Sequence, residues 1–218
     1  VNLASGTSLI AQNTFAGSVT YTRNLTTNNW YLASSPVAGE TLEDFIANNS
    51  FATGSGSNIG LAPYVNDGTA WDYQTTAISG TIVSGSGYSV KLASPGDLTF
   101  TGTLPVTDVD VAITTNTNGF NLIGNPYPSY LSGNTSADGT HNLISVNTAS
   151  LTEATIWLWN QATNSYDTFN LASSSLFISP AQGFFVSSNG SNTFSFTEAM
   201  QSHQSDSFQR TTNNRPEI

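Results

Sequence analysis

Residues 118–131 read NGFNLIGNPYPSYL, and residues 28–41 read NNWYLASSPVAGET. In both stretches a polar turn leads into a short apolar segment that ends at a proline. Proline cannot donate a ladder hydrogen bond, and it disfavours helix at the residue before it. We therefore predict that each stretch is a strand that ends in a turn fixed by the proline. We also predict that the two stretches are versions of one structural element.

Further segments repeat in the same order along the chain. The matches are WDYQ at 71–74 with YDTF at 166–169, GYSV at 87–90 with GFFV at 183–186, and FAGSV at 15–19 with FTGTL at 100–104. Chance can produce one such match, but it does not readily preserve the order of several. The sequence therefore predicts a duplicated unit.

These matches divide the chain into an N-terminal lead-in (1–14), a first β unit (15–99), a second β unit (100–200) and a polar segment (201–218). Early acidic and later apolar residues in 39–46 predict a short helix in the first unit. Its counterpart, 130–150, is rich in Ser, Asn and Gly and is expected to be mostly loop. We expect the polar segment to pack partly along the module and to lead into a following β domain or a partner chain.

The composition is that of an all-β protein. Only 8% of the 218 residues are charged, while 11% are aromatic, and Ser, Thr, Asn and Gly dominate the polar residues. This aromatic content argues against disorder, and these polar residues favour strands and turns. No apolar run approaches the roughly 20 residues of a membrane-spanning helix, so we predict no membrane insertion. We predict a β-sandwich-like module of two tandem, internally duplicated units with at most one or two short helices.

The charge balance excludes several classes of partner. The net charge is −10, and Lys91 is the only basic residue between Asn24 and Gln209. A nucleic-acid-binding protein needs clustered Lys and Arg, so we predict no nucleic-acid partner. The absence of cysteine excludes disulfides and Cys-ligated zinc, and it fits an exported protein that folds without disulfides. Residues 1–11 lack the features of a signal peptide, so an exported form is expected to be a mature chain.

No residue pattern in the chain is typical of an active site. The histidines His141 and His203 are far apart in polar surroundings, and no G-x-S-x-G segment is present to expose a nucleophilic serine. Asp72 and Asp167 occupy matching positions in the two units. They could form the carboxylate pair of a glycoside hydrolase, or they could stabilise two hairpin turns. We favour the turn role and predict no catalytic residues and no enzymatic activity.

Calcium is the one cofactor that the sequence leaves open. Asp108 and Asp110 alternate along a predicted strand and therefore face the same side. With Asp138 or a loop carbonyl, they would offer the hard oxygen ligands that calcium takes. The alternative is a solvated strand face, which we favour because the chain has no EF-hand loop or calcium-binding nonapeptide.

Aromatic side chains are the most promising functional material. Their flat apolar faces suit the C–H faces of sugars, and nearby Asn, Gln and Asp can hydrogen-bond to sugar hydroxyls. Because β cores also use aromatic residues for bulk, each one is either a ligand contact or part of the core. The candidate ligand-binding residues are Trp71, Tyr73, Tyr127, Tyr130, Trp157, Trp159 and Tyr166, and Trp30 and Tyr64 belong to the same class.

A family resemblance rests on three sequence segments taken together: NLIGNPYPS (121–129), IWLWNQATNSYDTFN (156–170) and ISPAQGFFV (178–186). They resemble a recurrent β module of large secreted surface proteins of the Bacteroidota, which commonly leave the cell by the type IX route. The resemblance covers most of residues 15–215. It implies an extracellular or cell-surface location in a multidomain protein, and it brings no established catalytic residues.

The leading functional hypothesis is a noncatalytic extracellular surface module that binds carbohydrate, or adheres to another surface, through exposed aromatics. The alternative is a structural spacer or assembly domain of a larger surface protein or filament, since low charge suits packing against like neighbours. A glycoside hydrolase is a third and weaker hypothesis. The expected partners are a polysaccharide or neighbouring domains of surface proteins.

Overall fold

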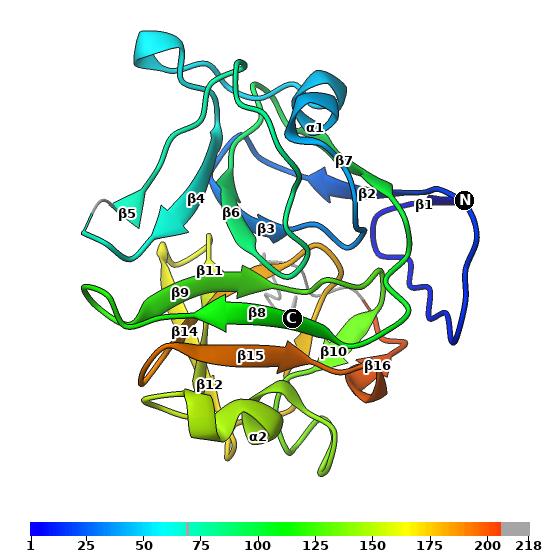
Figure 1. Ribbon diagram of the computed structural model, residues 1–218, viewed down its shortest axis with the longest axis vertical. Coiled ribbons are helices and arrows are strands. Elements are labelled where there is room, and N and C mark those ends of the chain that lie inside the picture. The colour runs from blue at the N-terminus through cyan, green and yellow to red at the C-terminus, as the bar shows by residue number, and fades with distance from the viewer. Residues whose placement is uncertain (69, 206–218) are drawn as a thin grey trace, which may run out of the picture.

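The computed structural model describes residues 1–68 and 70–205, which form an all-β structure with two short helices (Figure 1). The predicted fold class is therefore confirmed. Two halves are stacked, with β1–β7 in the upper part of Figure 1 and β8–β16 in the lower part. Within the described ranges, no helix is long and apolar enough to cross a membrane.

Among the described residues, each half contains one α-helix and a series of short strands. The first half comprises β1 (Asn2–Leu3), β2 (Val19–Leu25), β3 (Tyr31–Ser34), α1 (Leu42–Asn48), β4 (Leu61–Val65), β5 (Ala70–Trp71), β6 (Gly87–Val90) and β7 (Gly96–Gly102). The second half comprises β8 (Val109–Ile113), β9 (Phe120–Gly124), β10 (Tyr130–Ser132), α2 (Leu143–Asn147), β11 (Thr155–Asn160), β12 (Ser165–Asn170), β13 (Phe177–Ile178), β14 (Gly183–Ser187), β15 (Asn192–Phe196) and β16 (Gln201–Ser202).

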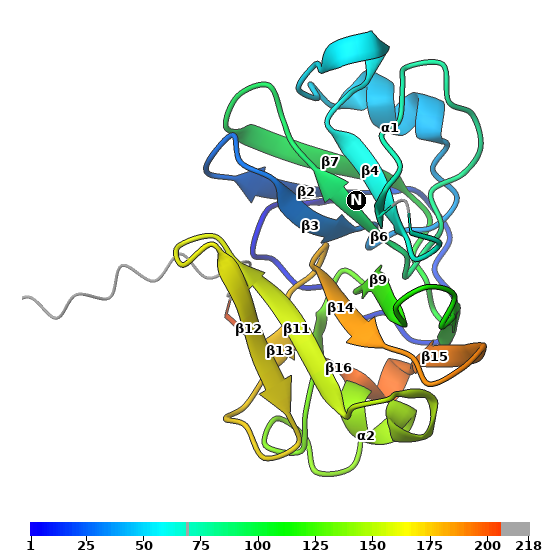
Figure 2. The same cartoon turned by 90° about the vertical axis from the view of Figure 1, so that its left-hand side faces the viewer.

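The main sheets have the same strand order in the two halves. The antiparallel order is β3-β6-β4-β5 in the first half and β9-β14-β11-β12 in the second. An antiparallel pair accompanies each sheet, β2 with β7 and β8 with β15. The second half also has a small sheet, β13-β10-β16, and β1 runs parallel to β2. Figure 2 shows one half above the other, with β11, β12 and β14 of the lower half side by side.

Alternating burial places the apolar side chains of these strands inside. In β2 every second residue is buried, and Asn24 between two of them is exposed, as expected for a strand with one covered face. Each half has its own core of buried apolar residues. A third, smaller cluster lies between the halves and consists of Leu32, Leu122 and Phe185.

The two proline turns of the opening sequences are closed in the same way. Val37 N–H donates to Ser35 Oγ (3.3 Å), and Tyr127 N–H donates to Asn125 Oδ1 (2.9 Å). In each case the side chain before the proline bonds to the backbone after it, as in ST and Asx turns. The buried Asn125 amide also donates to the carbonyls of Ser129, Ile178 and Ser179. This second turn is therefore anchored to the core of its half.

A buried asparagine fixes each helix to the neighbouring strand pair. Asn49, just after α1, donates from Nδ2 to Thr99 O (2.9 Å) and accepts at Oδ1 from Thr99 N–H (2.8 Å). Asn147, at the end of α2, makes the same pair of bonds with Ser195, at 2.9 and 2.7 Å. Both amides also donate to a helix carbonyl four residues back. Helix and strand pair are thus joined identically in the two halves.

The halves meet at two glycines. Gly87 begins β6, and Gly183 begins β14. A Cβ added to Gly87 would lie 2.5 Å from Leu122 Cγ, and one added to Gly183 would lie 3.0 Å from the Ala33 nitrogen. Both contacts reach into the opposite half. The lack of a side chain therefore allows the two backbones to approach each other here.

Main-chain hydrogen bonds cross the junction next to these glycines. Ser34 N–H, at the end of β3, donates to Ala181 O (3.1 Å), and Gly124 N–H, at the end of β9, donates to Gly85 O (2.9 Å). Both acceptor residues have left-handed backbone, with φ of 62° at Ala181 and 80° at Gly85. The two bonds occupy corresponding places, so the junction has approximate twofold symmetry.

The N-terminal lead-in contacts both halves. Its strand β1 pairs with β2 of the first half, while Leu9 N–H donates to Pro128 O (2.6 Å) in the second half. Ser8 Oγ lies 2.9 Å from His203 Nδ1, next to β16. The lead-in therefore adds a connection between the halves.

Two expectations about segment structure need correction. The expected border between residues 99 and 100 falls inside β7, which pairs with β2 as the closing strand of the first half. The stretch 130–150, expected to be mostly loop, contains β10 and α2. Asn142 caps α2 by accepting a hydrogen bond from Ser145 N–H (2.9 Å). This cap stabilises the start of a helix in a stretch whose composition suggested a loop.

The polar segment 201–218 begins inside the module. Gln201–Ser202 form β16 and pair with β10. The rest of the prediction for this segment concerns residues 206–218, which lie outside the described residues.

We expect Gly87→Ala and Gly183→Ala each to lower the free energy of unfolding by about 1–3 kcal/mol, because the added Cβ overpacks the junction. Gly139→Ala is the matched control, since a Cβ there meets nothing within 4 Å. It should change stability by less than about 0.5 kcal/mol. Urea unfolding followed by tryptophan fluorescence measures all three. Equal stability of the junction variants and the control would contradict this account of the junction.

Because the carboxyl of Glu40 is buried, we expect the free energy of unfolding to fall as the pH rises. The Glu40 side chain is 4% exposed, and burial raises the pKa of its carboxyl from 4.5 to about 8. The folded protein therefore holds a proton that the unfolded chain loses near pH 4.5, so the free energy of unfolding declines between these pH values and levels off above the folded pKa. Glu40→Gln should remove most of this slope in urea unfolding between about pH 5 and about pH 9. Glu43→Gln, at an exposed position on α1, should leave the slope intact.

Candidate functional site

Six aromatic side chains line an open hollow of about 410 Å³ where the two halves meet. They come from β4 and β5 of the first half and from β9, β11, β12 and β14 of the second. Figure 1 shows β4 and β5 lying above the strands of the second half. We call this group the aromatic cradle, and its members are Tyr64, Trp71, Phe120, Trp157, Tyr166 and Phe185.

Phe185 forms the floor of the aromatic cradle. It is 6% exposed, and it belongs to the cluster of buried residues between the halves. Its ring centroid lies 4.9 Å from that of Tyr64, 5.7 Å from that of Tyr166 and 6.2 Å from that of Trp71, all edge-on. Edge-to-face contacts of this kind stabilise aromatic groups beyond the area they bury. The rings therefore support one another around a common centre.

The rim of the aromatic cradle is open to solvent. Tyr166 is 41% exposed and Phe120 is 37% exposed, while Trp157 is half-buried beside Phe120 at 5.3 Å. Asn118 Nδ2 donates to the Tyr64 hydroxyl at 2.7 Å, which places an amide beside the rings. The hollow therefore combines flat apolar walls with polar groups.

The hydroxyl of Tyr166 stays protonated at neutral pH. Burial, and next the phenol of Tyr64, raise the pKa of Tyr166 above its ordinary value of 10.0. A protonated phenol both donates and accepts hydrogen bonds. Tyr166 can therefore bind neutral hydroxyl groups in either sense.

The structure brings together three of the predicted ligand-binding residues, Trp71, Trp157 and Tyr166. Trp159 packs edge-on against Tyr166 at 5.1 Å but lines a different hollow. Tyr73 is 45% exposed and packs against Trp30 at 5.8 Å, also outside the aromatic cradle.

Tyr127 and Tyr130 were predicted as ligand contacts, and both belong to the interior. Each is 0% exposed. Tyr127 donates its hydroxyl proton toward Thr107 O and Phe196 O, both at 2.9 Å, and Tyr130 OH lies 3.3 Å from Gly6 O. Their polar tips are satisfied by backbone carbonyls, which is how a core accommodates tyrosine. Neither side chain is available to a ligand.

Sequence reasoning missed Phe120 and Phe185. Phe120 stands opposite Trp30 in the match between the two opening stretches. Phe185 alternates with the buried core residue Phe184, so period-2 reasoning could have placed it on the other face of β14. Only the packing of the first half against β14, however, shows that this other face is also covered.

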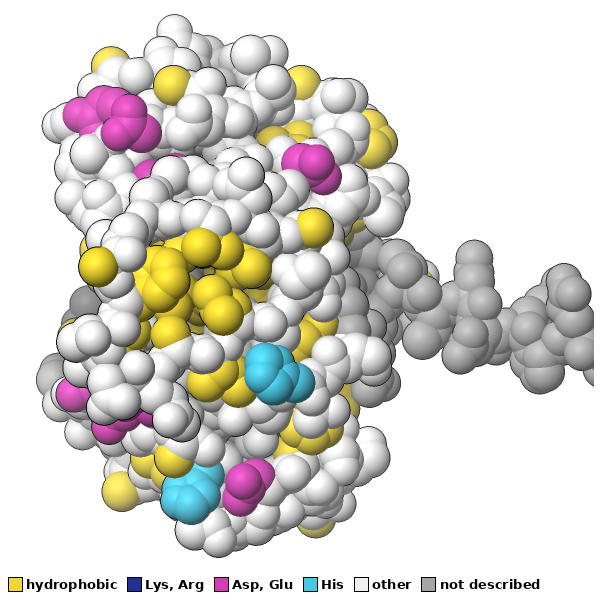
Figure 3. Space-filling view, turned by 90° about the vertical axis from the view of Figure 1, so that its right-hand side faces the viewer, with side chains coloured by type: hydrophobic (Ala, Val, Ile, Leu, Met, Phe, Trp, Pro, Cys, Tyr) yellow, Lys and Arg dark blue, Asp and Glu magenta, His cyan; other side chains and the backbone are white. Residues whose placement is uncertain are grey.

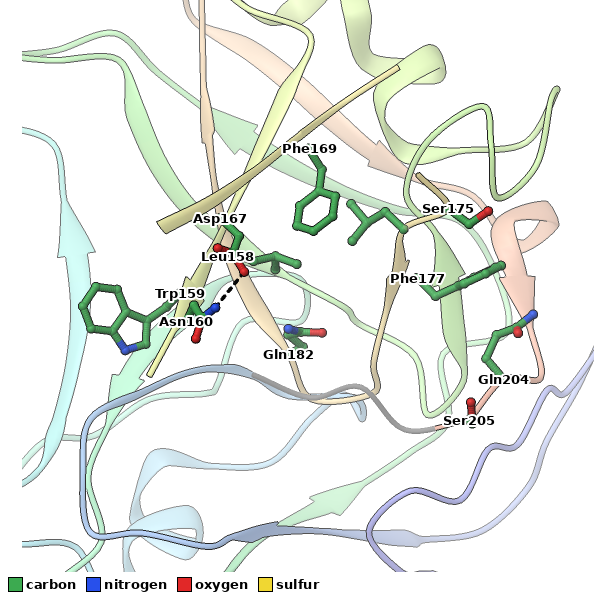
Figure 4. Close-up of a pocket in the computed structure, with 11 residues that line it drawn as sticks. Leu158, Trp159, Asn160, Asp167, Phe169, Ser175, Phe177, Gln182, Gln204 and Ser205 are labelled. Carbon is green, nitrogen blue, oxygen red and sulfur yellow. Dashed lines mark hydrogen bonds between the residues drawn. The ribbon is translucent and has the colours of Figure 1, made fainter. Parts of the chain in front are cut away.

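The paired carboxylates Asp72 and Asp167 are each held by a nearby amide. Gln74 Nε2 donates to Asp72 Oδ2 at 2.9 Å, and Asn160 Nδ2 donates to Asp167 Oδ2 at 2.9 Å. Figure 4 shows the second contact at the side of a hollow of about 160 Å³. These contacts suit side chains that stabilise local backbone structure.

The candidate calcium ligands are also engaged by the protein. Asp110 Oδ1 accepts from Ser195 Oγ (2.6 Å), and Asp108 Oδ1 accepts from Glu198 N–H (2.8 Å). Asp138 instead accepts from the backbone of its own turn. Among the residues that the structure describes, no three His, Cys, Asp or Glu side chains come together as a metal site. Figure 3 shows two separate histidine side chains in the lower part of the face that it presents.

We expect Tyr127→Phe to lower the free energy of unfolding by about 1–3 kcal/mol, because it leaves buried carbonyls without their donor. Tyr166→Phe should change it by less than about 0.5 kcal/mol, since that hydroxyl lies at an exposed rim. Urea unfolding of the two variants makes the comparison. A Tyr127→Phe protein as stable as the unmodified chain would contradict the structural role of this hydroxyl.

The sequence matches no protein-family model, and neither a curated protein nor a solved structure matches it. A functional proposal therefore depends on the geometry of the aromatic cradle and on the sequence itself.

Proposed function

We propose that the protein is a noncatalytic extracellular module that binds carbohydrate through the aromatic cradle. The observation that carries this proposal is the open hollow of about 410 Å³ with six aromatic walls. Its volume lies in the range of roughly 300–1,000 Å³ that is usual for small-molecule sites. The C–H faces of a sugar pack on aromatic rings, and the rim groups of Tyr166 and Asn118 can hydrogen-bond to its hydroxyls.

The carboxylates support a role without catalysis. A glycoside hydrolase needs two carboxyl groups across one cleft. Asp72 and Asp167 belong to different halves, and each accepts a hydrogen bond from a local amide. The lining of the aromatic cradle contains no acidic residue. The proposal therefore assigns the protein to binding rather than hydrolysis.

We also infer that the two halves are copies of one unit. The common strand order, the matching proline turns and the equivalent asparagine contacts of Asn49 and Asn147 support this inference. An extracellular location is supported by the sequence resemblance, and the absence of cysteine is consistent with export.

Assembly with neighbouring domains is the second candidate function. Hydrophobic side chains gather at the middle of the face shown in Figure 3. Exposed apolar groups of this kind occur where proteins contact one another. In an assembly domain or spacer, a neighbouring domain would cover them instead of a glycan.

Affinity electrophoresis against a panel of neutral polysaccharides tests the carbohydrate proposal. We expect at least one polymer to retard the protein, and we expect Trp71→Ala and Trp157→Ala each to weaken that binding about tenfold, which corresponds to about 1.4 kcal/mol of lost ring contact. Val146→Ala is the control, because this side chain is 43% exposed on α2, away from the aromatic cradle.

The absence of retardation across the panel would overturn the carbohydrate proposal, as would binding that both tryptophan variants retain. Sedimentation velocity then addresses assembly. Concentration-dependent association that Trp71→Ala abolishes would show that the aromatic cradle contacts another protein chain.

A further inference from the structure

A second hollow, separate from the aromatic cradle, lies at one end of the first four-stranded sheet. Its volume is about 270 Å³, and its lining includes Trp30, Tyr73 and Lys91. Trp30 directly precedes β3, Lys91 directly follows β6, and β3 and β6 are paired at Tyr31 and Val90. The strand register therefore brings the indole and the lysine to the same end of the sheet.

The backbone of Lys91 is held on both sides. Its N–H donates to Gly60 O (2.7 Å), and its carbonyl accepts from Ala52 N–H (2.9 Å). A Cβ added to Gly60 would lie 2.2 Å from Lys91 O, so the chain can pass this closely only because residue 60 is glycine. The lysine side chain thus starts from a fixed point.

The ammonium group of Lys91 lies over an aromatic face and not beside a carboxylate. Its Nζ is 6.0 Å from the centroid of the Trp30 ring. Within the described part of the chain, no carboxylate lies at ion-pair distance from this nitrogen. The ring orients the cation without neutralising its charge. Although the protein has a net charge of −10, this cation is not neutralised locally and is therefore available to an external anion.

The remaining walls of this hollow suit a sugar. Trp30 and Tyr73 stand edge-on with their centroids 5.8 Å apart, and Thr53, Ser55 and Asn58 contribute hydroxyl and amide groups. The volume is below the roughly 300–1,000 Å³ of sites for drug-sized molecules, which fits a single unit of a longer chain.

Only the first half carries this charged group. Aligning the sheets on the paired residues Ser34–Gly87 and Gly124–Gly183 places Phe120 at the position of Trp30 and Ser187 at that of Lys91. An aromatic residue is present at both places, whereas the cation is not. The charge is therefore specific to one hollow and is not a requirement of the fold.

We propose that Trp30, Tyr73 and Lys91 form a subsite for an acidic sugar unit, whose carboxylate pairs with Lys91 while the sugar ring packs on the aromatic side chains. This subsite is distinct from the aromatic cradle and does not depend on the function proposed for it. The ligand class is a polyuronate, because one flat ring, one carboxylate and neighbouring hydroxyls match what the hollow provides.

Affinity electrophoresis with polygalacturonate, alginate and hyaluronate tests this subsite, each in its acid form and as the carboxyl methyl ester. We expect at least one acid form to bind about tenfold more tightly than its ester, because esterification removes the charge that pairs with Lys91. Lys91→Gln should remove that preference, Lys91→Arg should keep part of it, and Trp30→Ala should weaken binding of the acid form. Added salt should weaken acid-form binding as well.

Val146→Glu is the matched control, because it also lowers the net charge by one but lies on α2 in the other half. It should keep the preference for the acid form. Equal binding of acid and ester forms, no binding of any polyuronate, or an unchanged preference in Lys91→Gln would each overturn the subsite. Neutral polysaccharides report on the aromatic cradle separately, so failure of one proposal is distinguishable from failure of the other.

Discussion

The close approach of two backbones at Gly87 and Gly183 is the constraint on which the rest of the structure depends. Each glycine begins a central strand of its sheet, and each leaves room for main chain of the opposite half. The crossing hydrogen bonds from Ser34 and Gly124 then fix the register between the sheets. Beyond the glycines the facing surfaces are filled by Leu32, Leu122 and Phe185, and further out by the rings of the aromatic cradle. The junction therefore determines where the aromatic cradle forms and how wide it opens.

A chain with 8% charged residues organises its polar interior with amides. Asn49, Asn125, Asn134 and Asn147 are buried, and each hydrogen-bonds to backbone groups of loops or strands. An amide supplies both donors and acceptors, and it avoids the desolvation cost of a buried charge. Two ionisable side chains, Arg23 and Glu40, are nevertheless buried. Burial raises the pKa of the Glu40 carboxyl and so favours its neutral form.

The two hollows differ in the side chains that line them: the aromatic cradle is lined by aromatic residues alone, whereas the second hollow also contains Lys91. The aromatic cradle takes side chains from both halves, so neither half can form it alone. The hollow around Lys91 belongs to the first half, and the corresponding place in the second half has Phe120 and Ser187. Structural features of the two halves, such as the asparagine contacts, are the same, whereas the exposed side chains differ. This difference is expected when the fold constrains buried positions and leaves surface positions free to change.

Much of the fold could be predicted from the sequence, because its signals are local. Composition indicated the all-β class, prolines marked the two strand exits, and early acidic residues predicted α1. Helix α2 was missed because one asparagine cap, and not composition, starts it. The predicted border between residues 99 and 100 was misplaced because short sequence matches between the halves do not reveal that β7 pairs with β2.

The candidate site was predictable only in part. The sequence indicated aromatic residues as the functional material, and Trp71, Trp157 and Tyr166 do line the aromatic cradle. It could not separate them from Tyr127 and Tyr130, which are buried. Period-2 alternation determines which residues share a face of a strand, and that information is present in the sequence. Whether that face meets solvent, its own core or the opposite half depends on the packing of distant segments, so only the tertiary structure decided which aromatic rings remain open to a ligand.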